Sequence, residues 1–208
     1  MRTKTPEQAE KILNVAVRLF ATHRFHEARM EDISAAAGVG KGTLYRYFKD
    51  KEELYLALLE RSSEQIETRM RAAVEQAIEP RAKLEALVDT IIRYFDDNPH
   101  VFDLIQHAEA LQRPNRRLPW KARAVSFEVT TAVILEGQRA GLFRVEDPTL
   151  AMLMLLGGLR AVFRFGAKPR PADLAERIVE GFLRGVAAAD PCISATETNG
   201  RGAKMSAK

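Results

Sequence analysis

The chain has 208 residues, 46% of them hydrophobic and 29% charged, with a net charge of +4 and a pI near 9.3. This length fits one large domain, or a small domain beside a larger one, and the apolar content allows a sizeable core. The single cysteine, Cys192, excludes an internal disulfide framework and favours the cytoplasm. No signal peptide is expected, because no apolar run follows the basic N-terminus. The most apolar stretch, from Ala151, contains Arg160 and Arg164 and is too short to span a membrane.

Apolar residues recur at helical spacing along nearly the whole chain, and no segment alternates as a strand does. We therefore expect an all-α fold of about nine helices. In chain order they cover approximately residues 6–23, 30–37, 41–47, 51–79, 84–95, 99–111, 120–140, 148–166 and 172–189, and Pro80 either ends the fourth helix or restarts it.

Several residues mark the ends of these helices. Pro6 suits a first turn, and Asp50 is placed to cap the helix that begins at Lys51. Gly141 suits a C-cap, and Asp147-Pro148 begins the next helix. From residue 190 onward the periodicity stops, and we expect a disordered tail over 190–208.

Residues 30–49, MEDISAAAGVGKGTLYRYFK, have the pattern of two short helices joined by a tight turn. Close crossing of the helices needs a small residue, which Ser34 supplies, and the turn needs a positive φ, which Gly38 allows. Apolar residues stand at the inward positions, namely Ile33, Ala37, Val39, Leu44 and Tyr47. The pattern predicts a helix-turn-helix, and the second helix of such a unit enters the major groove of DNA. The predicted domains are accordingly a DNA-binding domain over 1–50 and a helical domain over 51–189.

The outer face of the second helix carries residues suited to DNA. Lys41 is expected to reach a guanine edge, and Gly42 allows the helix to approach closely. The hydroxyls of Thr43 and Tyr45 can donate to phosphates. Basic residues outnumber acidic ones between residues 40 and 51, which suits a phosphate backbone; they are Lys41, Arg46, Lys49 and Lys51, against Asp50.

These residues also have a plain structural interpretation. Tyr45, Tyr47 and Phe48 can all be core residues; we expect Phe48 in the core, Tyr47 shared between core and DNA, and Tyr45 exposed. Each lysine, taken singly, is an ordinary solvated side chain, and only its place on the helix-turn-helix makes it a candidate contact.

The segment AGVGKGTLYRYF at 37–48, followed by KDKEEL at 49–54, closely resembles the DNA-binding signature of the TetR family. The specific match covers roughly residues 8–60, and beyond it only the length and the helical layout are similar. The resemblance implies base contacts at Lys41 and Gly42, and it implies phosphate contacts at Thr43, Tyr45, Tyr47 and Lys51.

Two positions depart from the family pattern. Arg24 precedes Phe25 where the family usually has glycine, and Ala28-Arg29 stand where Thr or Ser usually caps the second helix. A missing cap costs on the order of 1 kcal/mol. We hypothesise that Arg29 instead contacts a phosphate directly.

The resemblance also implies a homodimer, in which the helices at about 148–166 and 171–189 pair across a two-fold axis as a four-helix bundle. Such a dimer holds its recognition helices roughly 35 Å apart and reads a palindromic operator in double-stranded DNA. Gly157-Gly158 and the GxxxG at 181–185 would let helices approach closely between subunits, although packing within the monomer explains them equally well.

A small, mostly apolar effector is expected within residues 60–170, where its binding would shift the helix beginning at Lys51 and oppose DNA binding. Candidate pocket residues are Phe95, Phe102, Ile105, Trp120, Phe127 and Thr130. Each of them is also explained as ordinary core. Repression that a ligand relieves is therefore the expected function.

Two other classes of protein fit the sequence less well. An architectural or constitutive DNA binder without an effector needs no helical domain as large as this one. An enzyme is not expected, because the sequence has no activated nucleophile, phosphate-binding glycine loop or convincing carboxylate pair. The four histidines form no i, i+4 pair and have no neighbouring cysteine, so neither a metal nor another cofactor is expected.

Overall fold

The computed structural model describes residues 5–22, 27–110 and 120–186. Over these residues the fold is all-α, with nine helices and no strand, as the sequence predicts. The predicted tail at 190–208 lies outside the described residues.

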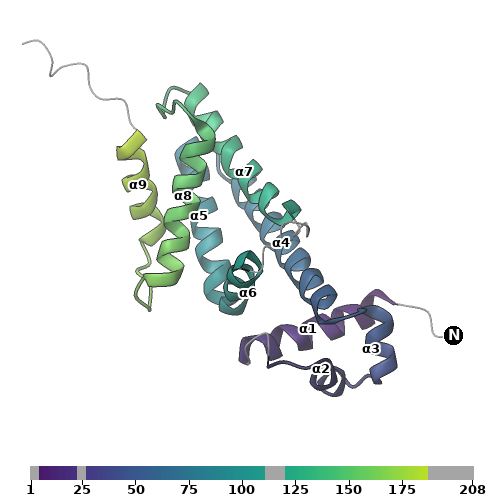
Figure 1. Ribbon diagram of the computed structural model, residues 1–208. Helices are drawn as coiled ribbons and strands as arrows, with labels where there is room; N and C mark the ends of the chain where they lie inside the picture. Colours follow the sequence, from purple (N-terminus) through teal and green to yellow (C-terminus); the bar gives the residue numbers. More distant parts are fainter. Residues whose placement is uncertain (1–4, 23–26, 111–119, 187–208) are drawn as a thin grey trace, which may run out of the picture.

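The molecule consists of a small N-terminal group of helices and a larger helical body, which α4 connects (Figure 1). The small group contains α1 (Pro6–Thr22), α2 (Met30–Ala36) and α3 (Lys41–Tyr47). The long α4 (Lys51–Gln76) leads from it into the body. The body contains α5 (Pro80–Asp97), α6 (Pro99–Ala110), α7 (Trp120–Arg139), α8 (Pro148–Phe165) and α9 (Leu174–Val186).

The predicted capping residues act as caps. The Asp50 carboxylate accepts a hydrogen bond from the backbone N–H of Glu53 at 2.8 Å, and Asp147 does the same for Thr149 at 2.9 Å. Gly141, with φ +72°, ends α7, and the next N–H, of Leu142, donates to the Gly137 carbonyl at 2.9 Å. Two helices begin at other residues than expected. Helix α5 begins at Pro80, ahead of the apolar pattern that starts at Leu84, and α9 begins at Leu174 rather than near 172, because residues 172 and 173 form a turn.

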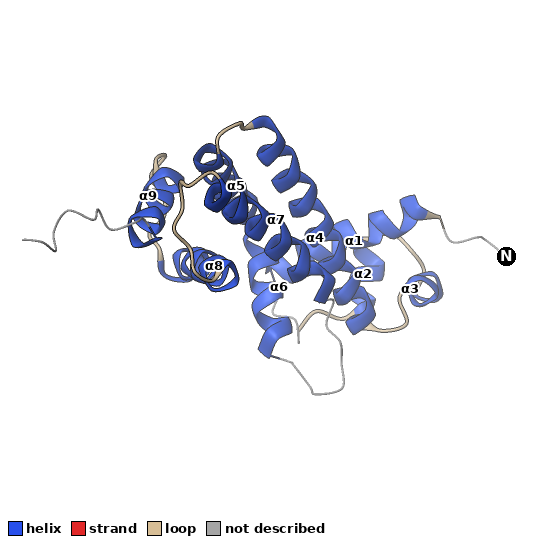
Figure 2. Ribbon diagram, turned by 90° about the horizontal axis from the view of Figure 1, so that it is seen from above, coloured by secondary structure: helices blue, strands red, loops and turns tan. Residues whose placement is uncertain are grey.

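Two hydrophobic cores follow the division between the small group and the body. The N-terminal core takes residues from α1, α2, α3, the first turns of α4 and one position of α6, Leu104. The second core begins at Ile66 of α4 and continues through α5, α7, α8 and α9. Helix α4 therefore contributes one end to each core, and α6 lies against α1, α4 and α5 (Figure 2). Both helices are placed to transmit a change in one core to the other.

Candidate DNA-binding surface and internal cavity

The turn between α2 and α3 is formed by backbone hydrogen bonds around Gly38. Gly38 has φ +63°, and its N–H donates to the Ala35 carbonyl at 3.0 Å. The next N–H, of Val39, donates to the Ser34 carbonyl, also at 3.0 Å. Ser34 itself is buried, and its hydroxyl donates to the backbone carbonyl of Glu31 at 2.9 Å. The structure thus has the glycine turn and the small crossing residue that the sequence predicts.

Helix α3 presents one face to the core and the other to solvent. Leu44 is fully buried, and Phe48 follows it into the N-terminal core. Tyr45 points outward with 41% of its surface exposed. Also exposed are Lys41, Gly42 and Arg46, while Thr43 and Tyr47 are half-buried. Lys41, Gly42, Tyr45 and Arg46, four of the residues predicted to meet DNA, therefore lie on the solvent-exposed side of α3.

Lys41, the predicted base contact, is paired with a carboxylate of α2. Its Nζ lies 2.6 Å from Glu31 Oε1, and both side chains remain more than half exposed. The hydrogen bond with Lys41 lowers the pKa of Glu31, and the same bond raises the pKa of Lys41. Because the pair is exposed to solvent, a DNA phosphate or base can replace Glu31 at little cost.

Two predicted phosphate contacts hold other parts of the N-terminal group together. The Tyr47 hydroxyl accepts a hydrogen bond from the Thr5 backbone N–H at 2.8 Å, which lowers the pKa of Tyr47. Lys51 donates to the Ala28 carbonyl at 3.0 Å, and burial lowers its pKa. Arg29 is the N-cap residue of α2, is exposed and makes no side-chain cap bond. Its proposed phosphate contact stays a prediction.

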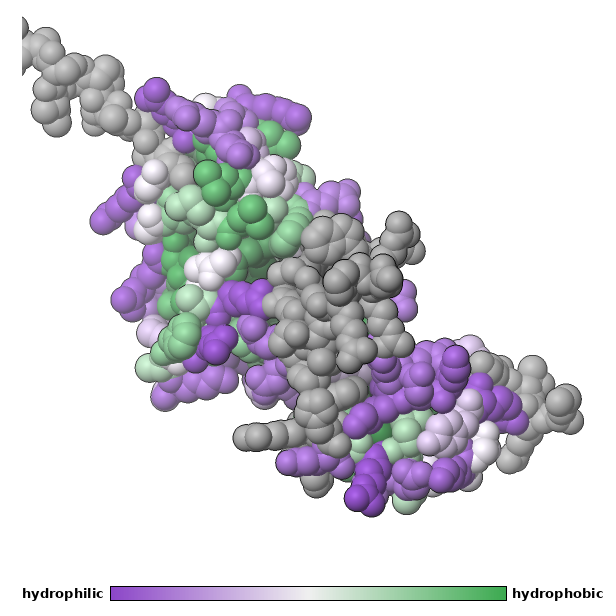
Figure 3. Space-filling model, viewed as in Figure 1, coloured by the Kyte–Doolittle hydropathy of each residue, from purple (hydrophilic) through white to green (hydrophobic). Residues whose placement is uncertain are grey.

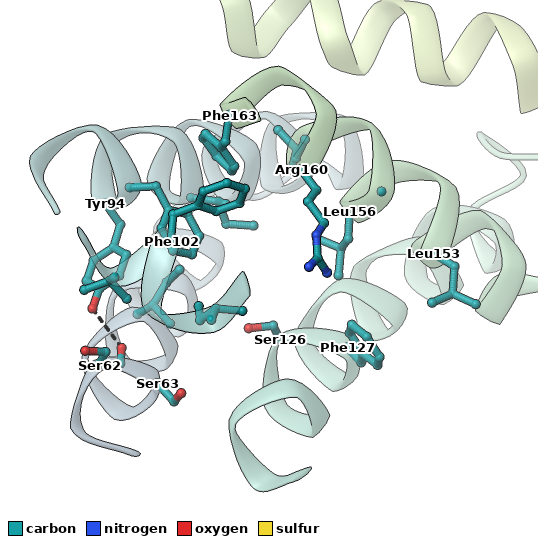
Figure 4. Close-up of a pocket in the computed structure, with 17 residues that line it drawn as sticks. Ser62, Ser63, Tyr94, Phe102, Ser126, Phe127, Leu153, Leu156, Arg160 and Phe163 are labelled. Carbon is teal, nitrogen blue, oxygen red and sulfur yellow. Dashed lines mark hydrogen bonds between the residues drawn. The ribbon is translucent and has the colours of Figure 1, made fainter. Parts of the chain in front are cut away.

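The helical body contains a cavity of about 340 Å³ that is partly open to the surface. Helices α4 to α8 all contribute to its wall, and most of the wall is apolar (Figure 4). Three phenylalanines from three helices meet on one side, with ring centroids 5.8 Å apart for Phe95 and Phe102, 5.0 Å for Phe95 and Phe163, and 5.5 Å for Phe102 and Phe163. The volume and the lining are those of a small-molecule site.

Four of the six predicted pocket residues line this cavity: Phe95, Phe102, Ile105 and Phe127. Thr130 does not, and we remove it from the candidate site. It is completely buried, and its hydroxyl donates to the Ser126 carbonyl one turn earlier at 2.7 Å. The side chain of Trp120 lies outside the described residues.

The sequence analysis missed the contribution of α8 and the polar part of the wall. Helix α8 supplies Leu153, Leu156, Arg160 and Phe163, and α4 and α7 supply three serines. Arg160 was noted only as an interruption of an apolar stretch. An arginine within such a run was the available signal, since a buried cation requires partners.

Within the described part of the chain, no group of three or more His, Cys, Asp or Glu side chains could hold a metal ion. Of the four histidines in the sequence, His23, His26 and His107 lie where side chains are not described.

The sequence matches two family profiles that together span most of the described structure. The profile described as "Bacterial regulatory proteins, tetR family" matches residues 12–58. A second, "Tetracyclin repressor-like, C-terminal domain", matches residues 77–186. The chain belongs to the tetR family. The predicted resemblance is thereby confirmed, and it extends beyond the helix-turn-helix into the helical body.

Several regulatory proteins are similar to the chain. It is 29% identical to the transcriptional activator FasR of Mycolicibacterium smegmatis over 54% of this chain and 52% of that protein. It thus aligns with about half the length of that relative. The "Fatty acid metabolism regulator protein" of Bacillus subtilis is 28% identical over 76% of this chain and 81% of its own.

A solved structure shares both the fold and its extent. The fatty acid degradation regulator FadR from Bacillus halodurans is 25% identical to the chain and has a TM-score of 0.73. The match covers 88% of this chain and 97% of that protein. The likeness therefore includes the helical body as well as the helix-turn-helix.

Proposed function

We propose that the protein is a ligand-responsive transcriptional regulator that binds a palindromic operator as a homodimer in the cytoplasm, and that its main action is repression. The observation that carries this proposal is the helix-turn-helix of a tetR-family chain, whose second helix presents Lys41, Gly42 and Tyr45 to solvent. A groove-entering helix needs this arrangement of an anchored inner face and a free outer face.

The helical body leaves an apolar face without a partner in the monomer. Along α8, Leu150 is 54% exposed, Met154 62% and Phe165 77%. Figure 3 shows apolar side chains gathered on this part of the body. An exposed apolar patch on a folded domain commonly marks an interface. Pairing of α8 and α9 with a second copy would cover it and set the distance between two recognition helices.

The glycines of α8 and α9 support the same pairing. A Cβ added at Gly157, Gly158, Gly181 or Gly185 would meet no other atom within 4 Å in the described chain. Packing within the monomer therefore does not require glycine at these positions, although Gly157 also lines the cavity. Close approach of a second copy would account for the other three.

The apolar stretch from Ala151 lies in α8, and the expectation that it is too short to span a membrane is wrong for the helix as a whole. Among the described residues, α8 is the one helix long and apolar enough to cross a membrane. Its composition alone supports that alternative only weakly. It carries Arg160 and Arg164, and Arg160 lines the cavity. We therefore assign its apolar face to dimer contacts.

The cavity supports an effector site, and α6 supports a route from it to the DNA-binding surface. Phe102 and Ile105 of α6 line the cavity. Leu104, between them, lies in the N-terminal core, and its carbonyl accepts a hydrogen bond from the hydroxyl of Tyr55 on α4. A ligand that displaces the two lining residues would shift α6 against α1 and α4. Operator and effector would then oppose each other through a reciprocal coupling free energy.

An architectural DNA binder remains the alternative. An architectural binder requires no cavity, so the mostly apolar cavity of the helical body favours the regulator. No observation on the described residues favours an enzyme.

The test is a fluorescence anisotropy titration of wild-type protein with the DNA that precedes its own gene, against a scrambled duplex. Lys41→Ala should weaken operator binding by about 1–3 kcal/mol. The matched control is Lys168→Ala, an exposed lysine on the body that pairs with Asp96 at 3.4 Å, and it should bind as wild type does. Equal affinity of the wild type for both duplexes would contradict the proposal.

A further inference from the structure

An acidic side chain lies on the surface that is predicted to meet DNA. Glu31, in the first turn of α2, is exposed, and its Oε1 lies 2.6 Å from the Nζ of Lys41 on α3. The two helices lie side by side in the N-terminal group (Figure 1). A carboxylate repels phosphate, so binding of the DNA backbone gives no reason for an acid at this place.

The helix dipole explains an acid in this turn, but it does not explain the pairing with Lys41. An acidic residue near a helix N-terminus is stabilised by the macrodipole, and the first turn of α2 has two, Glu31 and Asp32. Both are exposed. Of the two, it is Glu31 that reaches across to α3. Asp32 therefore shows what the dipole alone accounts for, and the ion pair needs a further reason.

The carboxylate of Glu31 lies one hydrogen bond away from the ammonium group that is predicted to meet a base. Lys41 is the first residue of α3, and the N-terminal residues of a recognition helix contact base edges. The hydrogen bond with Lys41 lowers the pKa of Glu31 below its ordinary value of 4.5, and the nearby Arg29 acts in the same direction, so the carboxylate is ionised at neutral pH.

Both groups of the pair have capacity for further hydrogen bonds. An ammonium group has three donors, and the two oxygens of a carboxylate accept about four hydrogen bonds. Lys41 can therefore donate to a base while it stays bonded to Glu31. The carboxylate can accept from a base in the same way.

The major-groove edges of the bases differ in whether they attract a carboxylate. Guanine presents the acceptors N7 and O6, and thymine presents the acceptor O4, so both repel it. Cytosine presents the N4 amine as a donor and no acceptor beside it. Adenine also has a donor, the N6 amine, but the acceptor N7 stands next to it. An ionised carboxylate therefore gains most at cytosine.

The spacing of the ion pair matches one G·C base pair. Guanine O6 and cytosine N4 are joined by a hydrogen bond of about 2.9 Å, close to the 2.6 Å between Lys41 Nζ and Glu31 Oε1. The ammonium group can then donate to O6, while the groove-facing N–H of N4 donates to the carboxylate. The four groups form a closed ring in which each donor meets an acceptor.

We propose that Glu31 is a specificity-determining residue, whose carboxylate accepts a hydrogen bond from the cytosine of the G·C base pair that Lys41 contacts through its guanine. This inference rests on the proposed function in one respect, that α3 enters the major groove of an operator. It adds a residue of α2 to the side chains that read bases, and it adds the base that this residue selects.

The first experiment selects the sequences that the full-length protein binds from a pool of random duplexes. Wild type should enrich a palindrome, and Lys41→Ala should lose the preference for one G·C base pair in each half. Glu31→Ala should lose the preference for the same base pair. Asp32→Ala is the matched control, because it removes the same charge from the same helix turn, and it should enrich the wild-type sequence. If Glu31→Ala and Lys41→Ala lose preferences at different base pairs, or if either loses none, the proposal is wrong.

The second experiment removes the groove-facing hydrogen of that cytosine and leaves the guanine in place. N4-methylcytosine carries a methyl group there when it is paired. By anisotropy titration, the modified duplex should raise the Kd of wild type by about fivefold or more, and that of Glu31→Ala by less than about twofold. Asp32→Ala should respond as wild type does. A wild type that is indifferent to the methyl group, or an equal response of Glu31→Ala, would overturn the contact.

The outcomes separate this inference from the proposed function. If wild type enriches a palindrome that Glu31→Ala enriches equally, the regulator stands and the role of Glu31 is wrong. If wild type enriches no sequence at all, the proposed operator binding fails, and the base contact of Glu31 fails with it.

Discussion

Gly38, in the turn of the helix-turn-helix, is required for its backbone conformation rather than for space. Its φ is +63°, and an added Cβ would come no nearer than 3.8 Å to Lys11 Nζ. A left-handed conformation costs other residues roughly 1–2 kcal/mol. We expect Gly38→Ala to lower the free energy of unfolding by about that amount, as measured by urea denaturation. An unchanged midpoint would contradict this account of the turn.

Gly42, four residues later, is not required for its backbone conformation. It lies exposed within α3, and an added Cβ would meet nothing within 4 Å. Alanine is favoured over glycine in a helix by up to about 1 kcal/mol. Gly42→Ala should therefore keep or raise the free energy of unfolding. Its affinity for the operator should fall, because the methyl group lies between α3 and the groove; anisotropy titration would check this. Undiminished operator affinity would remove Gly42 from the DNA-binding surface.

Conformation at these positions could be predicted from the sequence, but side-chain partners could not. Helical periodicity suffices to place Tyr45 outside and Phe48 inside, and a short turn suffices to require Gly38. The pairing of Lys41 with Glu31 and of Lys51 with the Ala28 carbonyl depends on how the helices cross. That crossing is a tertiary property, which spacing along one chain does not contain.

Helix α6 contacts both the N-terminal group and the helical body, and a hydrogen bond from Tyr55 of α4 helps to keep it in place. The Tyr55 hydroxyl, which is buried, donates to the Leu104 carbonyl. Tyr55→Phe should cost about 1 kcal/mol of unfolding free energy. It should also speed amide hydrogen exchange in α6 and in the first turns of α4, because the hydrogen bond between these two segments is lost.

A matched control lies at the far end of α7. Gln138 Nε2 donates to the Val145 carbonyl at 2.7 Å, and this side chain is partly buried. Gln138→Leu should lower stability similarly but speed exchange only near that end. If Tyr55→Phe gave the same exchange pattern as Gln138→Leu, α6 would not be the connecting helix.

His100, in the first turn of α6, makes the stability of this helix depend on pH. Burial lowers its pKa below the ordinary value of 6.5, against the opposing effect of Asp103, and Arg61 adds to the lowering. The unfolded chain therefore takes up the proton first as the pH falls. The stabilising contribution of neutral His100 is complete above about pH 6.5 and is lost progressively below it.

The His100→Gln variant should show a weaker loss of stability on acidification. We expect the difference in unfolding free energy between wild type and variant to change between pH 7 and pH 5, in favour of the variant at the lower pH. Urea denaturation at several pH values measures this difference. A constant offset across the range would contradict a titrating His100.

At the scale of elements, the order and type of the helices could be predicted from the sequence, whereas only some of the residues that line the cavity could be. The caps at Asp50, Asp147 and Gly141 depend on local sequence, which is why they could be predicted. Aromatic residues on α5, α6 and α7 indicated a pocket. The contribution of α8 to the cavity wall could not be predicted, because its apolar residues suit a dimer interface, a core and a cavity wall equally well.

At the scale of the whole molecule, α8 has two faces with different tasks. One face carries Arg160 and Phe163 into the cavity. The other carries Leu150, Met154 and Phe165, which are exposed in the monomer. Since both faces belong to one rigid helix, occupancy of the cavity and the packing of two subunits can influence each other. The separation of the recognition helices would then depend on both.

Met154→Asp tests the outer face of α8 without touching the cavity. Met154 is 62% exposed in the monomer, so the substitution should leave the monomer's own fold intact. It would bury an unpaired charge if two copies pack there, which costs several kcal/mol in a closed interface. We expect light scattering after size exclusion to give a monomer, and operator binding to weaken because each recognition helix then binds alone. The matched control is Ile78→Asp, an apolar residue that is 86% exposed between α4 and α5, which should remain a dimer. A Met154→Asp protein that stays dimeric would place the subunit interface elsewhere.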